Sequence, residues 1–89
     1  PSYYAAEAQK WAKKYGLKCR ILGEKEARKE KMGLFLGVGQ GSSQENKVVI
    51  VEYQPSSSSK HKTIGLVGKG VTFDSGGISL KPSSRMEDM

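Results

Sequence analysis

A run of four β-branched residues, VVIV at positions 48–51, constrains the fold more than any other feature of this chain. β-Branched side chains favour strands, and a continuous apolar run predicts a strand that is covered on both faces. Such strands are typical of parallel sheets in α/β proteins. A second apolar run, TIGLV at 63–67, predicts another strand. We therefore expect an α/β fold with three layers, helix, sheet and helix, and a largely parallel or mixed sheet.

The first sixteen residues predict an amphipathic helix. Apolar side chains recur at the spacing of one helical face, at Tyr4, Ala8, Trp11, Ala12 and Tyr15. Ser2 is the expected N-cap, and Gly16 is the expected left-handed residue that ends the helix. We expect the apolar face to lie in the core, where each large aromatic side chain contributes about 1.5–3 kcal/mol when it is fully buried.

The middle of the chain predicts shorter elements. Residues 17–22 (LKCRIL) form the expected first strand, and residues 24–32 (EKEARKEKM) a charged helix that ends at Gly33. The serine-rich stretch at 54–60 is an expected loop. Helices and strands that alternate in this way support the α/β assignment.

Charge and cysteine content exclude several classes of protein. Fifteen Lys and Arg against nine Asp and Glu give a net charge of +6, but these charges are scattered along the chain and interleaved with acidic residues. This pattern favours solvated helix faces over a specific nucleic-acid site.

Cys19 is the one cysteine, so no internal disulfide can form, and no apolar run is long enough to span a membrane. We expect a cytoplasmic protein without a membrane segment.

The segment GKGVTFDSGGISLKP at 68–82 is the best candidate for chemistry, because it follows an expected strand and ligands bind beyond the carboxyl ends of such strands. It holds Lys69, Asp74 and Lys81 among four glycines. The alternative is a plain glycine turn with a surface Asp–Lys pair, worth at most about 1 kcal/mol. Neither a Walker A loop nor a dinucleotide fingerprint fits, because the required glycines are absent.

VGKGVTFDSGGISLKP at 67–82 closely resembles the metal-binding segment of the leucyl aminopeptidases, the cytosol aminopeptidase family of two-metal exopeptidases. MGLFLGVGQGS at 32–42 and VVIVEY at 48–53 resemble the strands that precede this segment in the family. The opening PSYYAAEAQKWAKKYGL resembles the first helix of the family's catalytic domain. The resemblance covers nearly the whole chain, and it implies that residues 1–89 are the first part of that domain.

The resemblance also implies a role for individual residues. Lys69 matches a lysine whose amine ligates one metal ion, and Asp74 matches the carboxylate that contacts both ions and the substrate site. Lys81 matches the catalytic lysine, which stays charged and polarises the substrate carbonyl. Ser79 matches a serine that lines the substrate site. Two of the five usual metal ligands are therefore expected in this chain, and we expect the 89 residues alone to be inactive.

The implied function is a metal-dependent aminopeptidase that releases N-terminal residues, with a leucine-type preference, from peptides with a free N-terminus. The implied cofactors are two divalent ions, Mn²⁺ or Zn²⁺, with bicarbonate as a further candidate. The implied assembly is a homohexamer in the cytoplasm. The alternative from a different class is a non-catalytic basic module that binds a partner or DNA, which the charge of +6 leaves open.

Overall fold

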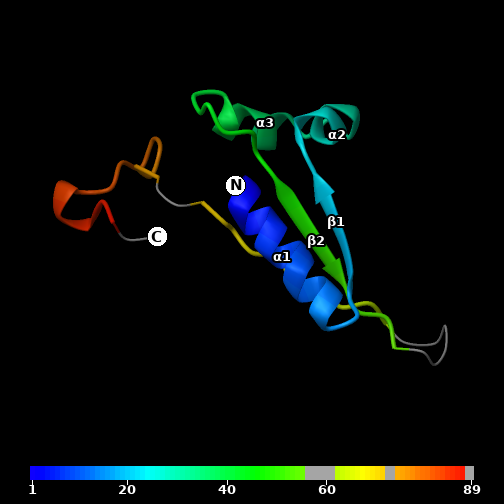
Figure 1. The fold of residues 1–89 in the computed structure, drawn as a ribbon. Helices are drawn as coiled ribbons and strands as arrows, with labels where there is room; N and C mark the ends of the chain where they lie inside the picture. Colours follow the sequence, from blue (N-terminus) through cyan, green and yellow to red (C-terminus); the bar gives the residue numbers. More distant parts are fainter. Residues whose placement is uncertain (56–61, 72–73, 88–89) are drawn as a thin grey trace. The chain divides into compact units, whose positions relative to one another are not determined.

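The computed structural model describes residues 1–55, 62–71 and 74–87. The chain divides into two compact units, Pro1–Ser58 and Ser59–Met89, which are described separately. Among the described residues, the first unit contains a two-stranded sheet with three helices, and the second contains turns and one 3-10 helix, η1 (Ser83–Arg85) (Figure 1). None of the helices in the described ranges is long and apolar enough to cross a membrane.

Helix α1 (Ser2–Lys14) begins and ends within two residues of the predicted bounds. Pro1, not Ser2, is the N-cap, because the helix already includes Ser2. At the other end Gly16 has φ of 67°, and the Leu17 N–H donates to the carbonyl of Ala12 at 2.8 Å. This is the geometry of a glycine-terminated helix. The prediction that Gly16 ends the helix is therefore confirmed.

The packing of α1 differs from the predicted core. Ala5 and Ala12 are buried at 5% and 2% exposure, whereas Trp11 is 52% exposed and Tyr4 is 71% exposed. Small side chains allow the helix to lie close to the sheet, and two strands are too narrow to cover the larger side chains beside them. The predicted burial of Ala12 is confirmed, and the predicted burial of the aromatic side chains is wrong for this structure.

The two-stranded sheet is antiparallel, which corrects the expectation of a largely parallel or mixed sheet. Strand β1 (Lys18–Leu22) pairs with β2 (Val48–Glu52) in a register that places Arg20 opposite Ile50. The connecting helices lie at one end of the strand pair rather than on a sheet face, so β2 returns antiparallel to β1 (Figure 1). Helix α1 contacts both strands. The described residues of the first unit thus combine helices with a strand pair in an α/β arrangement, and the three-layer arrangement is not confirmed.

Helix α2 (Glu24–Lys29) follows β1 directly. Its first turn is closed by Glu26, whose Oε2 accepts the Gly23 N–H at 2.9 Å. This hydrogen bond is the main cause that lowers the pKa of Glu26. Helix α2 ends before the predicted position at Gly33, because Lys31 takes the left-handed conformation with φ of 56° and the Met32 N–H donates back to Ala27.

Helix α3 (Gly33–Gly39) occupies the segment that the family resemblance indicated as a strand, so that expectation is wrong. The loop that follows α3 is fixed by two side chains. Asn46 donates its Nδ2 to the carbonyl of Phe35 at 2.6 Å, and Glu45 Oε1 accepts the Glu24 N–H at 2.6 Å. These contacts hold the loop against both helices and lead the chain into β2.

The second unit lacks the strand that TIGLV predicted. Residues 62–71 have no regular secondary structure, and Ile64, Leu66 and Val67 are exposed at 84% or more. A strand needs a neighbour for its backbone hydrogen bonds, and the strand pairing found in the described ranges joins β1 to β2. Two predicted features lie outside the described residues in part. These are residues 56–60 of the expected loop at 54–60, and Phe73 of the glycine-rich segment.

Candidate functional site

A tight turn over residues 74–81 forms the framework of the candidate site. The Lys81 N–H donates to the Ser75 carbonyl at 2.7 Å and closes the turn. Gly76 and Gly77 have φ of 93° and 69°, values that residues other than glycine rarely adopt. A Cβ on Gly76 would clash with the Ser79 carbonyl oxygen. Glycine at position 76 therefore permits the close approach of two backbone segments.

Replacement of Gly76 by alanine is expected to open this turn. The left-handed conformation costs about 1–2 kcal/mol for an L-residue, so Lys81 amide exchange should accelerate on the order of tenfold. Hydrogen exchange with mass spectrometry on a full-length enzyme that carries these residues measures this rate. The matched control is Gly65→Ala, because the new Cβ meets no atom within 4 Å and φ is not positive. Equal exchange rates in the two variants would contradict the role of Gly76.

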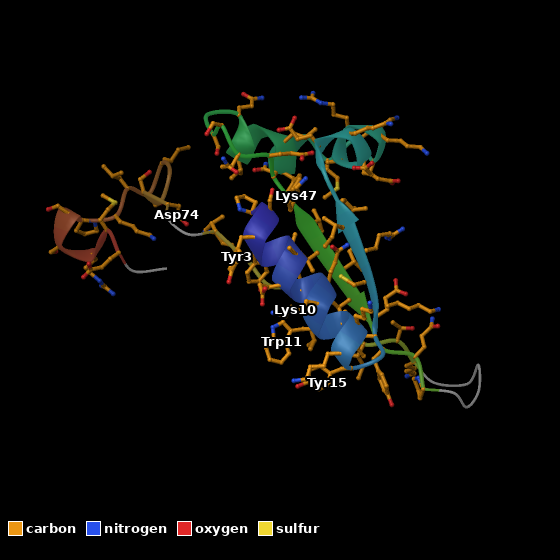
Figure 2. All side chains as sticks on the ribbon, in the orientation of Figure 1. Tyr3, Lys10, Trp11, Tyr15, Lys47 and Asp74 are labelled. Carbon is orange, nitrogen blue, oxygen red and sulfur yellow. The ribbon has the colours of Figure 1, made fainter. Side chains whose placement is uncertain are left out.

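Asp74 lies between two lysine amines. Its Oδ2 accepts a hydrogen bond from Lys69 Nζ, and its Oδ1 lies 3.2 Å from Lys81 Nζ. The Gly76 N–H also donates to Oδ1, at 3.0 Å. The carboxylate side chain is 30% exposed and Lys81 is 21% exposed, whereas Lys69 is 69% exposed. Figure 2 labels Asp74 at the start of the turn.

These contacts stabilise the ionised form of Asp74. The Lys69 hydrogen bond is the largest cause, followed by that of Lys81, and together they lower the pKa of Asp74 from 3.8 to about 2. A depressed pKa means that the ion pairs contribute their stabilisation above pH 3.8 and lose it as the pH falls through about 2. At neutral pH the turn therefore presents a fully charged carboxylate.

A carboxyl ¹³C titration of the metal-free chain is expected to give a midpoint near 2 for Asp74, well below the ordinary value of 3.8. The Lys69→Met variant should raise this midpoint, because it removes the largest cause of the shift. Lys62→Met serves as the control, because Lys62 is exposed and is not a cause of the shift. A midpoint near 3.8 in the wild-type chain would show that Asp74 does not form these ion pairs in solution.

The structure brings together three of the four predicted site residues, namely Lys69, Asp74 and Lys81. Ser79, the fourth, is an exposed residue of the same turn. The sequence interpretation missed the Gly76 N–H as a partner of Asp74, although an aspartate two residues before a glycine is a recognisable signal for such a turn. An Asp–Lys ion pair is also what the plain surface turn predicts.

The donor set fits part of a metal site. A charged carboxylate and an amine in contact with it can both serve as ligands of one divalent ion when the amine has lost its proton. Within the described ranges, no group of three or more His, Cys, Asp or Glu side chains is placed to hold a metal. A closed site of four or more ligands therefore requires further donors beyond this cluster.

Comparison with known proteins identifies the family. The profile described as "Cytosol aminopeptidase family, catalytic domain" matches residues 1–89. The chain is 52% identical over its whole length to a probable cytosol aminopeptidase of Brucella anthropi, and 47% identical to those of Desulfotalea psychrophila and Wolbachia pipientis. It spans only 17–18% of the length of these relatives. Comparison with solved structures gives no match. The chain therefore belongs to the cytosol aminopeptidase family.

Proposed function

We propose that the chain supplies part of the active site of a metal-dependent aminopeptidase that releases N-terminal residues from peptides. The observation that carries the proposal is the position of Asp74 between Lys69 and Lys81, in a segment of a chain that matches the family's catalytic-domain profile. The names of the relatives support aminopeptidase activity. The direct test is hydrolysis of amino-acid amides by a full-length enzyme that carries Lys81→Ala, beside its wild type.

Lys69 and Asp74 would hold divalent metal ions in the full-length enzyme. An ordinary lysine has a pKa of about 10.4, so its amine can bind a metal only after it loses its proton. Lys69 Nζ and Asp74 form an ion pair in the chain without metal. Both groups would become ligands when metal binds. When bound, the ions would supply a water-derived nucleophile near neutral pH and positive charge that polarises a carbonyl group.

Lys81 acts as a fixed positive charge in the proposed site. It contacts the same carboxylate as Lys69, but through the other oxygen, and it is less exposed than Lys69. An ammonium held in this way stabilises negative charge that develops on the carbonyl oxygen of a substrate. The two lysines would thus work in opposite protonation states, with Lys69 neutral and Lys81 charged. Ser79, in the same turn, would line the substrate site.

The remaining expectations concern the whole protein. We propose peptides with a free N-terminus as substrates, Mn²⁺ or Zn²⁺ as the metal, and bicarbonate as a further cofactor. We also propose that the full-length protein is a cytoplasmic homohexamer with a three-layer catalytic domain. Residues 1–89 would lie at the start of that domain. The word "cytosol" in the names of the relatives supports the location. The alternative of a basic DNA-binding or assembly module has the charge of +6 as its support.

A further inference from the structure

The backbone N–H of Gly76 is the neutral donor to the Asp74 carboxylate. It donates to Oδ1 at 3.0 Å, and the Lys81 ammonium lies 3.2 Å from the same oxygen. The other oxygen, Oδ2, accepts a hydrogen bond from Lys69. Oδ1 therefore faces Gly76 and Lys81, whereas Oδ2 faces Lys69. Because the acceptor is charged, the hydrogen bond from Gly76 is stronger than one between two neutral groups.

Both lysines have a second task in the proposed site. Lys69 has to lose its proton before its amine can bind a metal ion, and a neutral amine does not attract Asp74 as an ammonium does. Lys81 has to offer its charge to the substrate carbonyl. The Gly76 N–H is neutral and is assigned to neither metal nor substrate. Its contact with Asp74 is therefore the one of these three that can stay unchanged when metal and substrate bind.

We propose that the Gly76 N–H positions the Asp74 carboxylate, by holding Oδ1 so that Oδ2 stays directed toward Lys69. Gly76 is thus a positioning residue, because it acts on the metal site through Asp74. The inference rests on the proposed function, since it takes Asp74 and Lys69 as metal ligands. Groups that hydrogen-bond a ligand without touching the metal typically contribute about 10–100-fold to metal affinity.

The turn holds this N–H in a fixed direction. The peptide unit between Ser75 and Gly76 is planar, so its carbonyl and its N–H are oriented together. The carbonyl accepts the Lys81 N–H at 2.7 Å, and the N–H of the same unit donates to Asp74. One peptide unit therefore links the Lys81 backbone to the Asp74 carboxylate. A donor in the backbone also requires no ordering of a flexible side chain.

Replacement of single amides by esters tests the inference in the full-length enzyme. Glycolic acid in place of Gly76, introduced by cell-free translation with a chemically charged suppressor tRNA, removes the N–H and leaves every side chain of the turn in place. The Zn²⁺ affinity, measured by competition with a chromogenic chelator, is expected to fall about 10–100-fold. The ester also makes the Ser75 carbonyl a weaker acceptor for Lys81, so closure of the turn needs its own control.

Two further esters serve as controls. The hydroxy-acid analogue of lysine at position 81 removes the N–H that binds the Ser75 carbonyl, but it keeps the Gly76 N–H and the Lys81 ammonium. It should lower the Zn²⁺ affinity less than the ester at position 76. Glycolic acid in place of Gly77 puts an ester into the same turn and keeps the Gly76 N–H. It should leave the Zn²⁺ affinity at the wild-type value.

Two results would overturn the inference. Equal Zn²⁺ affinities of the esters at positions 76 and 77 would show that the Gly76 N–H does not position Asp74. An affinity of the position-81 ester as low as that of the position-76 ester would assign the effect to closure of the turn alone.

The Asp74→Asn enzyme, measured beside the esters, separates failure of this inference from failure of the proposed function. Wild-type Zn²⁺ affinity in Asp74→Asn would remove Asp74 from the metal site, and the proposed function would fail with it. Weaker Zn²⁺ binding in Asp74→Asn without weaker binding in the position-76 ester would reject only the role of Gly76.

Discussion

Replacement of Lys81 by alanine in a full-length enzyme is expected to lower kcat for amino-acid amides on the order of 100-fold, the usual loss when one electrostatic donor is removed from a developing oxyanion. The KM should change less, because the charge on the carbonyl oxygen is largest in the transition state. Lys81 is suited to this role because Asp74 holds it in the turn at 3.2 Å. Steady-state kinetics on a leucine amide provide the measurement.

Two further variants test whether the loss of kcat is specific to the charge of Lys81. Lys62→Ala removes an exposed lysine of the same unit and should retain the wild-type kcat. Lys81→Arg keeps the positive charge and should recover part of the activity lost with alanine, though not all, because the guanidinium is larger and planar. If Lys81→Ala kept kcat within about threefold of wild type, the electrostatic role of Lys81 would be wrong.

Replacement of Asp74 by asparagine is expected to weaken metal binding at least about 100-fold, since even loss of a group that only orients a ligand costs 10–100-fold. Asparagine keeps the shape of the side chain and can still accept the Gly76 N–H, so the turn should persist. It removes the charge that a divalent ion requires. Activity should therefore fall with metal content and should return in part at high metal concentration.

The matched control for Asp74 is Glu87→Gln, which neutralises an exposed carboxylate in the same unit. It should leave metal affinity unchanged. Circular dichroism of both variants checks that neither has lost its fold. An Asp74→Asn enzyme that binds metal as tightly as the Glu87→Gln enzyme would remove Asp74 from the metal site.

Local signals in the sequence predicted local structure well. Gly16 ends α1 as expected, because a left-handed residue after a helix depends on a few neighbouring hydrogen bonds. The contacts of Asp74 with Lys69 and Lys81 also follow from short separations along a glycine-rich turn. The end of α2 was missed because Lys31 takes a conformation that usually indicates glycine.

Features that depend on distant neighbours could not be predicted in the same way. The β-branched run in β2 indicated burial on both faces, but a strand's direction and cover are set by other strands and helices. Leu66 is apolar yet 95% exposed, and Trp11 is 52% exposed. The burial of these side chains likewise depends on distant neighbours. Hydrophobic patterns show which side chains favour burial, whereas the neighbours that cover them come from the rest of the fold.

The central claim is that Asp74 belongs to the metal site and Lys81 to the substrate site. The most direct test is the metal content of purified full-length enzyme, measured by elemental mass spectrometry for the wild type, Lys81→Ala and Asp74→Asn. Lys81→Ala is expected to retain the wild-type ratio of metal to protein, whereas Asp74→Asn is expected to lose metal. A full complement of metal in Asp74→Asn, or loss of metal in Lys81→Ala alone, would contradict these roles of the two residues.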